Sequence, residues 1–369
     1  MTLVIEQDIE QNIDKNDTYE GYGKYNSRGL TGLQNLGNMC YLNSILQSLS
    51  HTYELQDFLE DKKWAKKVKN NYDSLLLVEF DKLMRLMWSQ NCIVSPKGFV
   101  SFVQKLAKHK KNSEFCGWDQ SDASEFLIFI LDGFHNSLKR SVTISINGNV
   151  KNDTDKIALK CCNRFKELIE NDYSEIVDIF YGMQATIIYD KDNNISNEKT
   201  MKNVLSIASE PFFILSVPIP PNKSTLYDCL DVHTECEELV GDNKWYNDEK
   251  GEKQDAIKKM LYWSLPKVLI IDMKRYNYSG NKNQKLIDFP INELDMRKYV
   301  IGYDKEKYIY DCYAICNHSG SVYGGHYTAY VKNANGKWYH YNDSNVKEVR
   351  KSSLITSKAY CLFYRIKNN

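Results

Sequence analysis

The chain has 369 residues, of which 42% are hydrophobic and 26% are charged, and 48 Lys and Arg balance 48 Asp and Glu. A chain of this length can bury a large core, in one domain or in two closely packed subdomains. The zero net charge argues against a protein that binds nucleic acid or anionic membranes through a general basic excess. We therefore expect no nucleic-acid partner, and partner choice must depend on local surface patches.

The sequence contains no apolar run of the roughly 18 residues that a membrane-spanning helix needs, so no membrane partner is expected. Its N-terminal apolar stretch is only Leu3 to Ile5, which is too short for a secretory signal. The ten cysteines are scattered and show no dense disulfide framework. These features predict an intracellular protein, in the cytoplasm or nucleus, whose cysteines are thiols: core residues, metal ligands or a nucleophile.

The first 28 residues are polar and lack an apolar period, so a flexible leader is expected over residues 1–28. The folded part is expected to begin near Gly29, with helices as far as about residue 140. The helix predicted after Cys40 has apolar residues at the spacing of one buried face, at Leu42, Ile45, Leu46 and Leu49.

Two further helices are predicted at residues 75–88 and 122–138, and Asp119 or Ser121 is expected to cap the second. From about residue 176, segments rich in Val, Ile, Tyr and Phe predict strands, at residues 184–189, 212–217, 267–276, 308–317, 326–332, 337–341 and 359–364. Polar residues 147–155 and 190–202 are interpreted as surface insertions. Helices followed by strands indicate an α+β protein with a largely antiparallel sheet.

A nucleophile is predicted at Cys40. Glycines at positions 29, 32 and 37 permit a tight loop before the helix that begins at or near this residue. A thiol at a helix N-terminus faces unpaired N–H groups and the positive end of the helix dipole, and both favour the reactive thiolate. Asn35, just upstream, offers a side-chain amide that could help to hold an oxyanion.

A base for this nucleophile is predicted at His326, on a strand followed by an Asn-Gly turn and a second strand, which is a strong hairpin signal. A four-residue loop would place His326 opposite position 343, and a two-residue turn would place it opposite 345. Either register brings Asn342 and Asp343 near the histidine, as a Cys–His pair with an orienting third residue requires. Because side chains alternate along a strand, only one of the two can point at His326, and the pattern leaves open which.

These segments resemble two motifs of the ubiquitin-specific proteases. Asn35-Leu-Gly-Asn-Met-Cys40-Tyr, followed by Leu-Asn-Ser, is similar to the family's Cys box. Asn317-His-Ser-Gly, Gly324-Gly-His-Tyr-Thr-Ala-Tyr and Trp338-Tyr-His-Tyr-Asn-Asp-Ser are similar to its His box. Residues 119–127, 210–220 and 265–276 also match family segments, so the resemblance covers about residues 29 to 365.

The resemblance implies a papain-like cysteine protease of palm, thumb and fingers over residues 29–369. Residues 29–175 would form the mainly helical thumb, and residues 176–369 the palm and fingers. The implied reaction is thiol-dependent hydrolysis of the isopeptide or peptide bond at the C-terminal glycine of ubiquitin, with ubiquitin and ubiquitinated proteins as partners and no cofactor. Carried over by position, the catalytic residues are Cys40 as nucleophile, His326 as base, Asn342 at the third position, Asp343 as the acid after it, and Asn35 at the oxyanion hole.

The resemblance also assigns substrate contacts. Asp122 and Glu125 match acids that meet the arginines of the ubiquitin tail, and residues three apart on a helix share a face. Without the motif, a solvated or capping pair would be the preferred interpretation. Gly324 and Gly325 are expected to leave a narrow channel that only a Gly-Gly tail can thread.

Several positions depart from the family pattern. Met39 stands where Thr or Ser is usual, and Ser124 where Gln is usual. Many members bind zinc in the fingers through two C-x-x-C pairs, but Asp248 and Gly251 occupy the second pair, so no zinc is expected there. Cys229, His233 and Cys236 lack a fourth ligand, and no metal is expected at them either.

Two alternatives stand beside the deubiquitinase hypothesis. A catalytically silent ubiquitin-binding scaffold would have lost the Cys, the His or the third residue, and this chain retains all three. A protease for a related ubiquitin-like modifier would keep the same catalytic residues, and so it stays open.

Overall fold

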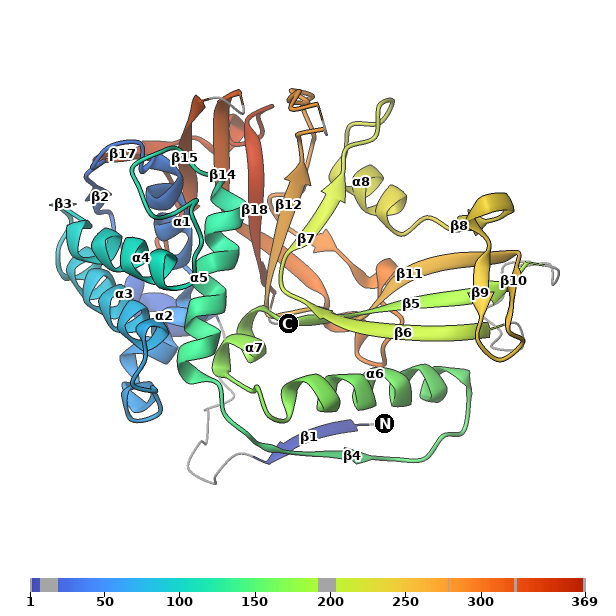
Figure 1. Ribbon diagram of the computed structural model, residues 1–369. Helices are drawn as coiled ribbons and strands as arrows, with labels where there is room; N and C mark the ends of the chain where they lie inside the picture. Colours follow the sequence, from blue (N-terminus) through green and yellow to red (C-terminus); the bar gives the residue numbers. More distant parts are fainter. Residues whose placement is uncertain (1, 7–18, 192–203, 278, 322–323, 368–369) are drawn as a thin grey trace.

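A computed structural model describes residues 2–6, 19–191, 204–277, 279–321 and 324–367. It consists of a helical region, a central sheet and an arm of long strands that extends from the sheet (Figure 1). One hydrophobic core joins the helical region to one face of the central sheet, and a second core covers the other face.

The helical region comprises α1 (Cys40–Ser50), α2 (Tyr53–Glu60), α3 (Tyr72–Ser89), α4 (Lys97–His109) and α5 (Ala123–Leu138). Every residue of α1 is buried, because α5 packs on it from one side and the central sheet from the other. The short strands β2 (Gly32–Leu33) and β3 (Ile93–Val94) pair in parallel beside this region. The three helices predicted from the sequence are confirmed.

Asp122 caps α5, not Asp119 or Ser121 as expected. Its Oδ1 accepts hydrogen bonds from the backbone N–H groups of Ser124 and Glu125 at 2.8 and 3.1 Å. The cap therefore lies one residue beyond Ser121, because a carboxylate reaches two amides of the first turn at once.

The central sheet has the strand order β17-β16-β15-β14-β18-β12-β7, and β13 pairs with β14. All of these pairs are antiparallel except β12 with β7. The strands are β7 (Leu215–Pro218), β12 (Val268–Lys274), β13 (Leu294–Asp295), β14 (Ile309–Ser321), β15 (Gly324–Lys332), β16 (Trp338–Asn342), β17 (Asn345–Val349) and β18 (Ala359–Ile366). Helix α1 packs on β14 and β15, and this contact positions the site.

The arm is a four-stranded sheet in the order β6-β5-β11-β8, with the β9–β10 hairpin near its far end (Figure 1). Its strands are β5 (Gly182–Asp190), β6 (Val204–Phe212), β8 (Glu237–Leu239), β9 (Trp245–Asn247), β10 (Glu252–Gln254) and β11 (Ala256–Ser264). Strands β6 and β11 were not predicted, because Ser and Glu in β6 and two consecutive lysines in β11 interrupt their apolar alternation. Helices α6 (Asp153–Ile169) and α7 (Glu175–Phe180) precede the arm, and α6 packs on β5 and β6.

Two parts of the expected leader have defined structure, which corrects the prediction for residues 1–28. Strand β1 (Thr2–Glu6) pairs antiparallel with β4 (Thr143–Asn147), and a 3-10 helix covers Tyr19–Tyr25. Tyr25 is 2% exposed and stacks on Tyr53 of α2, with ring centroids 4.6 Å apart. Of the insertion expected at 190–202, residues 192–202 lie outside the described residues.

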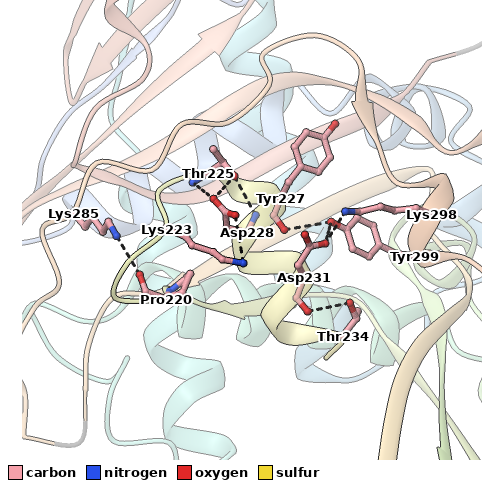
Figure 2. Close-up of polar contacts among 10 residues, drawn as sticks. All are labelled: Pro220, Lys223, Thr225, Tyr227, Asp228, Asp231, Thr234, Lys285, Lys298 and Tyr299. Carbon is pink, nitrogen blue, oxygen red and sulfur yellow. Dashed lines mark hydrogen bonds and ion pairs between the residues drawn. The ribbon is translucent and has the colours of Figure 1, made fainter. Parts of the chain in front are cut away.

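Helix α8 (Leu226–His233) lies beside β7, and Figure 2 shows the polar contacts that hold it. Thr225 and Asp228 form a reciprocal capping box at its N-terminus. Asp231 accepts a hydrogen bond from the Tyr299 hydroxyl and pairs with Lys298, both at 2.7 Å. None of the helices in the described ranges has the length and apolarity that a membrane crossing requires.

Candidate active site

Cys40 and His326 come from two elements that pack directly on each other. Cys40 is the first residue of α1, and His326 lies in β15. Helix α1 packs on β15, and the backbone N–H of Tyr327, which follows His326, lies close enough to the Cys40 sulfur to favour its thiolate. The contact between α1 and β15 therefore brings together residues that are far apart in the sequence.

Burial raises the pKa of the Cys40 thiol above its ordinary value. The N–H groups of Tyr327, Tyr41 and Cys40 itself favour the thiolate, while the charge of Asp343 opposes it. Cys40 is only 2% exposed, so desolvation outweighs the helix N-terminus. The helix position, which by itself favours the thiolate, is therefore not enough to lower the pKa of the Cys40 thiol.

His326 is held by Asn342. Its Nε2 lies 2.7 Å from Asn342 Oδ1, whereas Asp343 directs its oxygens elsewhere. Asp343 Oδ1 accepts from Asn43 Nδ2 at 2.8 Å, and its Oδ2 accepts from Asn35 Nδ2 at 3.0 Å. The geometry therefore supports Asn342 as the orienting residue and Asp343 as an anchor for α1 and the loop before it.

The observed hairpin register differs from both predicted registers. Lys332 pairs with Trp338 and Ala329 with Tyr341, so the loop spans residues 333–337. Within this loop, the Asn333 N–H donates to the Lys337 carbonyl at 2.9 Å. Extended along the same ladder, the register places His326 opposite position 344, between the two predicted positions.

Asn35 organises the loop before α1. Its Oδ1 accepts from the N–H groups of Gly37 and Met39 at 3.0 and 3.1 Å. Its Nδ2 donates one hydrogen to Asp343 and carries a second one. Gly37 and Asn38 have φ of 117° and 52°, so the loop turns sharply between Asn35 and Cys40.

The predicted substrate acids differ in their surroundings. Asp122 is half-buried: it caps α5, and its Oδ2 accepts from the hydroxyls of Tyr360 and Tyr327. Glu125 is exposed one helical turn away. Glu114 lies close to both, and burial together with their negative charges raises its pKa. These three carboxyl groups make a local acidic surface, although the net charge of the chain is zero.

Gly324 and Gly325 differ in the space that a side chain would have. A Cβ on Gly325 would lie 2.2 Å from His318 Nε2 and 2.6 Å from the Ser319 carbonyl oxygen. A Cβ on Gly324 would lie 3.6 Å from Gln120 Oε1, which is an ordinary van der Waals contact. Close packing against His318 thus explains the absence of a side chain at 325, whereas a side chain at 324 would make only an ordinary contact with Gln120.

Three residues near the site, Asn43, Asp272 and Gln120, have no role predicted from the sequence. Asn43 lies within the Leu-Asn-Ser that follows the Cys box, and it binds Asp343. Ser124 donates to Asp272 Oδ1 at 2.7 Å, and burial raises the pKa of Asp272 to about 6. Gln120 makes two hydrogen bonds to the backbone of Gly325. The motif around Asn43 was the available signal, whereas the other two contacts depend on tertiary packing.

At the far end of the arm, Asp248 and Gly251 lie in the turn of the β9–β10 hairpin. Asn247 organises this turn: its Oδ1 accepts from the N–H groups of Glu249 and Lys250 at 3.0 and 3.2 Å. Among the residues that the structure describes, no three His, Cys, Asp or Glu side chains converge as a metal site would require. Around α8, Cys229 is buried and Cys236 is exposed.

Comparison with known proteins relates this site to a family. The sequence model of the ubiquitin carboxyl-terminal hydrolases matches residues 31–364. Human ubiquitin carboxyl-terminal hydrolase 2 is 34% identical over 359 residues, covering 94% of this chain and 57% of that protein. The chicken protein of the same name is 34% identical over 356 residues, covering 92% and 94%. The chain thus spans little more than half of the human relative.

Solved structures of the same family have a similar fold. The Ubp8 chain of a SAGA DUB module bound to monoubiquitin has a TM-score of 0.70 and 26% identity, covering 94% of this chain and 70% of that one. The same module bound to ubiquitin aldehyde also gives 0.70. The likeness confirms the α+β, papain-like fold class. By sequence and by fold, this chain belongs to the ubiquitin carboxyl-terminal hydrolase family, and its resemblance to the ubiquitin-specific proteases is confirmed.

Proposed function

We propose that this chain is a cysteine-type deubiquitinase, which hydrolyses the isopeptide or peptide bond at the C-terminal glycine of ubiquitin. The proposal is carried by the hydrogen bond between His326 and Asn342, because His326 lies in β15, which packs on the helix that begins at Cys40. Family membership supports the choice of substrate, as do neighbours solved with monoubiquitin and ubiquitin aldehyde. In this assignment residues 29–175 form the thumb, and residues 176–369 the palm and fingers.

The reaction begins with a proton transfer. Asn342 Oδ1 can only accept, so the neutral His326 ring carries its proton on Nε2 and keeps Nδ1 free as the base. His326 takes the Cys40 proton as the sulfur attacks the glycine carbonyl carbon. It then returns that proton to the leaving lysine amine, and a thioester remains. Water attacks the thioester with His326 as base, which releases the ubiquitin carboxylate and restores the thiol.

The negative oxygen formed at each attack needs hydrogen-bond donors. We assign this role to the Asn35 amide, whose second hydrogen is not used by Asp343. Asp343 would act by holding Asn35 and Asn43 together, and so would place the amide relative to α1. Asp343 is in this view a positioning residue.

The substrate side of the proposal uses the acidic surface. Glu125, which is exposed, would meet an arginine of the ubiquitin tail directly, with Asp122 adding its charge from the helix cap. Gly324 would line the path of the Gly-Gly end, because it presents no side chain and its missing Cβ would make only an ordinary contact with Gln120. All ten cysteines are free thiols, which supports an intracellular location in the cytoplasm or nucleus.

The test is reaction with a ubiquitin whose C-terminus carries a thiol-reactive group, read by the mass of the intact protein. One adduct is expected on the unmodified chain and none on Cys40→Ala. Cys236→Ala is the matched control, because Cys236 is an exposed free thiol that should not matter for labelling.

An adduct on Cys40→Ala would contradict the nucleophile assignment. If the unmodified chain formed no adduct with ubiquitin, the proposed substrate would be wrong. Repeating the reaction with other ubiquitin-like modifiers would then separate a different substrate from a catalytically silent chain.

A further inference from the structure

Near Cys40, one edge of strand β15 is not paired with another strand among the described residues. Strand β15 pairs with β16 only from Ala329 to Lys332 among the described residues. Closer to its start, the same strand has β14 on one side, where Gly325 lies opposite Gly320. On the other side, the backbone N–H of Tyr327 lies near the Cys40 sulfur, where it favours the thiolate. Alternate residues of a strand present their backbone groups to the same edge. Gly325, Tyr327 and Ala329 therefore share this edge of β15.

The side chain of Gln120 occupies this edge at Gly325. Gln120 Nε2 donates to the Gly325 carbonyl oxygen, and Gln120 Oε1 accepts from the Gly325 N–H, both at 2.7 Å. Because a carboxamide carries the same donor and acceptor as a peptide group, the pair reproduces the two bonds that an added strand would make. Gln120 thus occupies both backbone hydrogen-bonding groups of Gly325, on the edge of β15 that lies near Cys40.

Gln120 reaches β15 from the loop before α5, two residues ahead of the Asp122 cap. Two contacts hold this loop in place. Gln104 Nε2 of α4 donates to the Gly117 carbonyl at 2.8 Å, and Asn38 Nδ2 donates to the Trp118 carbonyl at 3.1 Å. The Gln120–Gly325 contact is exposed, so nothing buried forces it to persist.

We propose that Gln120 is an intramolecular latch: its carboxamide occupies the backbone position on β15 that the extended C-terminal tail of the substrate must take to reach Cys40. The latch rests on the proposed function and adds a regulating contact to that site. Binding of the tail exchanges two hydrogen bonds from Gln120 for two from the peptide backbone. Part of the binding free energy is then spent on displacing the side chain, which weakens apparent affinity without changing the chemical step.

The test compares Gln120→Ala with the unmodified chain, using ubiquitin with a C-terminal fluorogenic amide. The latch predicts that KM falls about three- to tenfold while kcat is unchanged, since two exposed hydrogen bonds no longer compete with the substrate. Gln104→Ala is the matched control: it loosens the same loop without touching Gly325, and its KM should change less.

Other outcomes overturn the latch. A lower kcat at constant KM would make Gln120 a positioning residue for His326, and a higher KM would make it a substrate contact. An unchanged KM and kcat would show that the contact has no role in binding. Turnover by the unmodified chain establishes the proposed function whichever of these is found, whereas no turnover in either chain would overturn the function and the latch together.

Discussion

Asn342 and Asp343 are neighbours in the chain and yet serve different partners. Strand β16 ends at Asn342, which contacts His326. Asp343 has a φ of 50°, so the backbone turns there and directs the carboxylate to Asn35 and Asn43. A neutral amide thus contacts His326, while the charged residue holds the loop and the helix that carry Cys40.

Asn342→Ala should lower kcat by about 10²-fold or more, because His326 loses the acceptor that fixes its tautomer and orientation. Steady-state hydrolysis of ubiquitin with a fluorogenic C-terminal amide measures this. Asn345→Ala is the control, since Asn345 faces Asn342 in the β16–β17 ladder but is exposed. Full activity of Asn342→Ala would remove Asn342 from the mechanism.

Among the elements, α2 and β18 are joined by a charge pair inside the protein. Arg365 Nε and Nη2 donate to the two carboxylate oxygens of Glu54 at 2.5 and 3.0 Å. Nη2 also donates to the His51 carbonyl, and the guanidinium lies over the rings of Tyr53 and Tyr313. Only 8% of the Arg365 side chain and 12% of the Glu54 side chain are exposed, so water cannot replace either partner.

Glu54→Ala should destabilise the protein by about 3–5 kcal/mol, because it leaves the Arg365 charge buried without its partner. Urea denaturation followed by circular dichroism measures this. Glu348→Ala removes an exposed partner of Lys337 and should cost less than about 1 kcal/mol. Equal effects of the two substitutions would mean that the Arg365 charge is solvated.

At the scale of the whole molecule, the core contains histidines that are kept neutral. Burial lowers the pKa of His51 to about 4, and burial with the nearby Lys282 charge does the same for His318. His51 makes contacts with Ser50, Gln47 and Tyr341 that suit a neutral ring. Asp272 has the opposite effect on the pH dependence of stability, because burial raises its pKa to about 6.

Stability should fall as the pH drops from about 6.5 to about 4. In this window the histidines bind protons in the unfolded state but stay neutral in the folded state. Each histidine then changes the free energy of unfolding by at most about 1.4 kcal/mol per pH unit. Asp272 works in the other direction between its folded pKa of about 6 and its ordinary value of 3.8, since the folded state protonates first.

Urea midpoints measured across this pH range provide the check, with His51→Gln as the variant. The urea midpoint of His51→Gln should change less with pH than that of the unmodified chain, whatever the absolute stability of the variant, because one titrating group is gone. An unchanged slope would show that His51 titrates alike in both states.

The sequence by itself determined the α+β class, the helix at Cys40, the strand at His326 and the family. These depend on local periods and on motifs of contiguous residues, which are readable without a fold. Tertiary structure decided which of Asn342 and Asp343 meets His326, because that depends on a five-residue hairpin loop and a turn at positive φ. It also decided the raised pKa of Cys40 and the contact of Gln120 with Gly325. Desolvation and long-range hydrogen bonds arise only when distant segments pack, so no pattern along the chain encodes them directly.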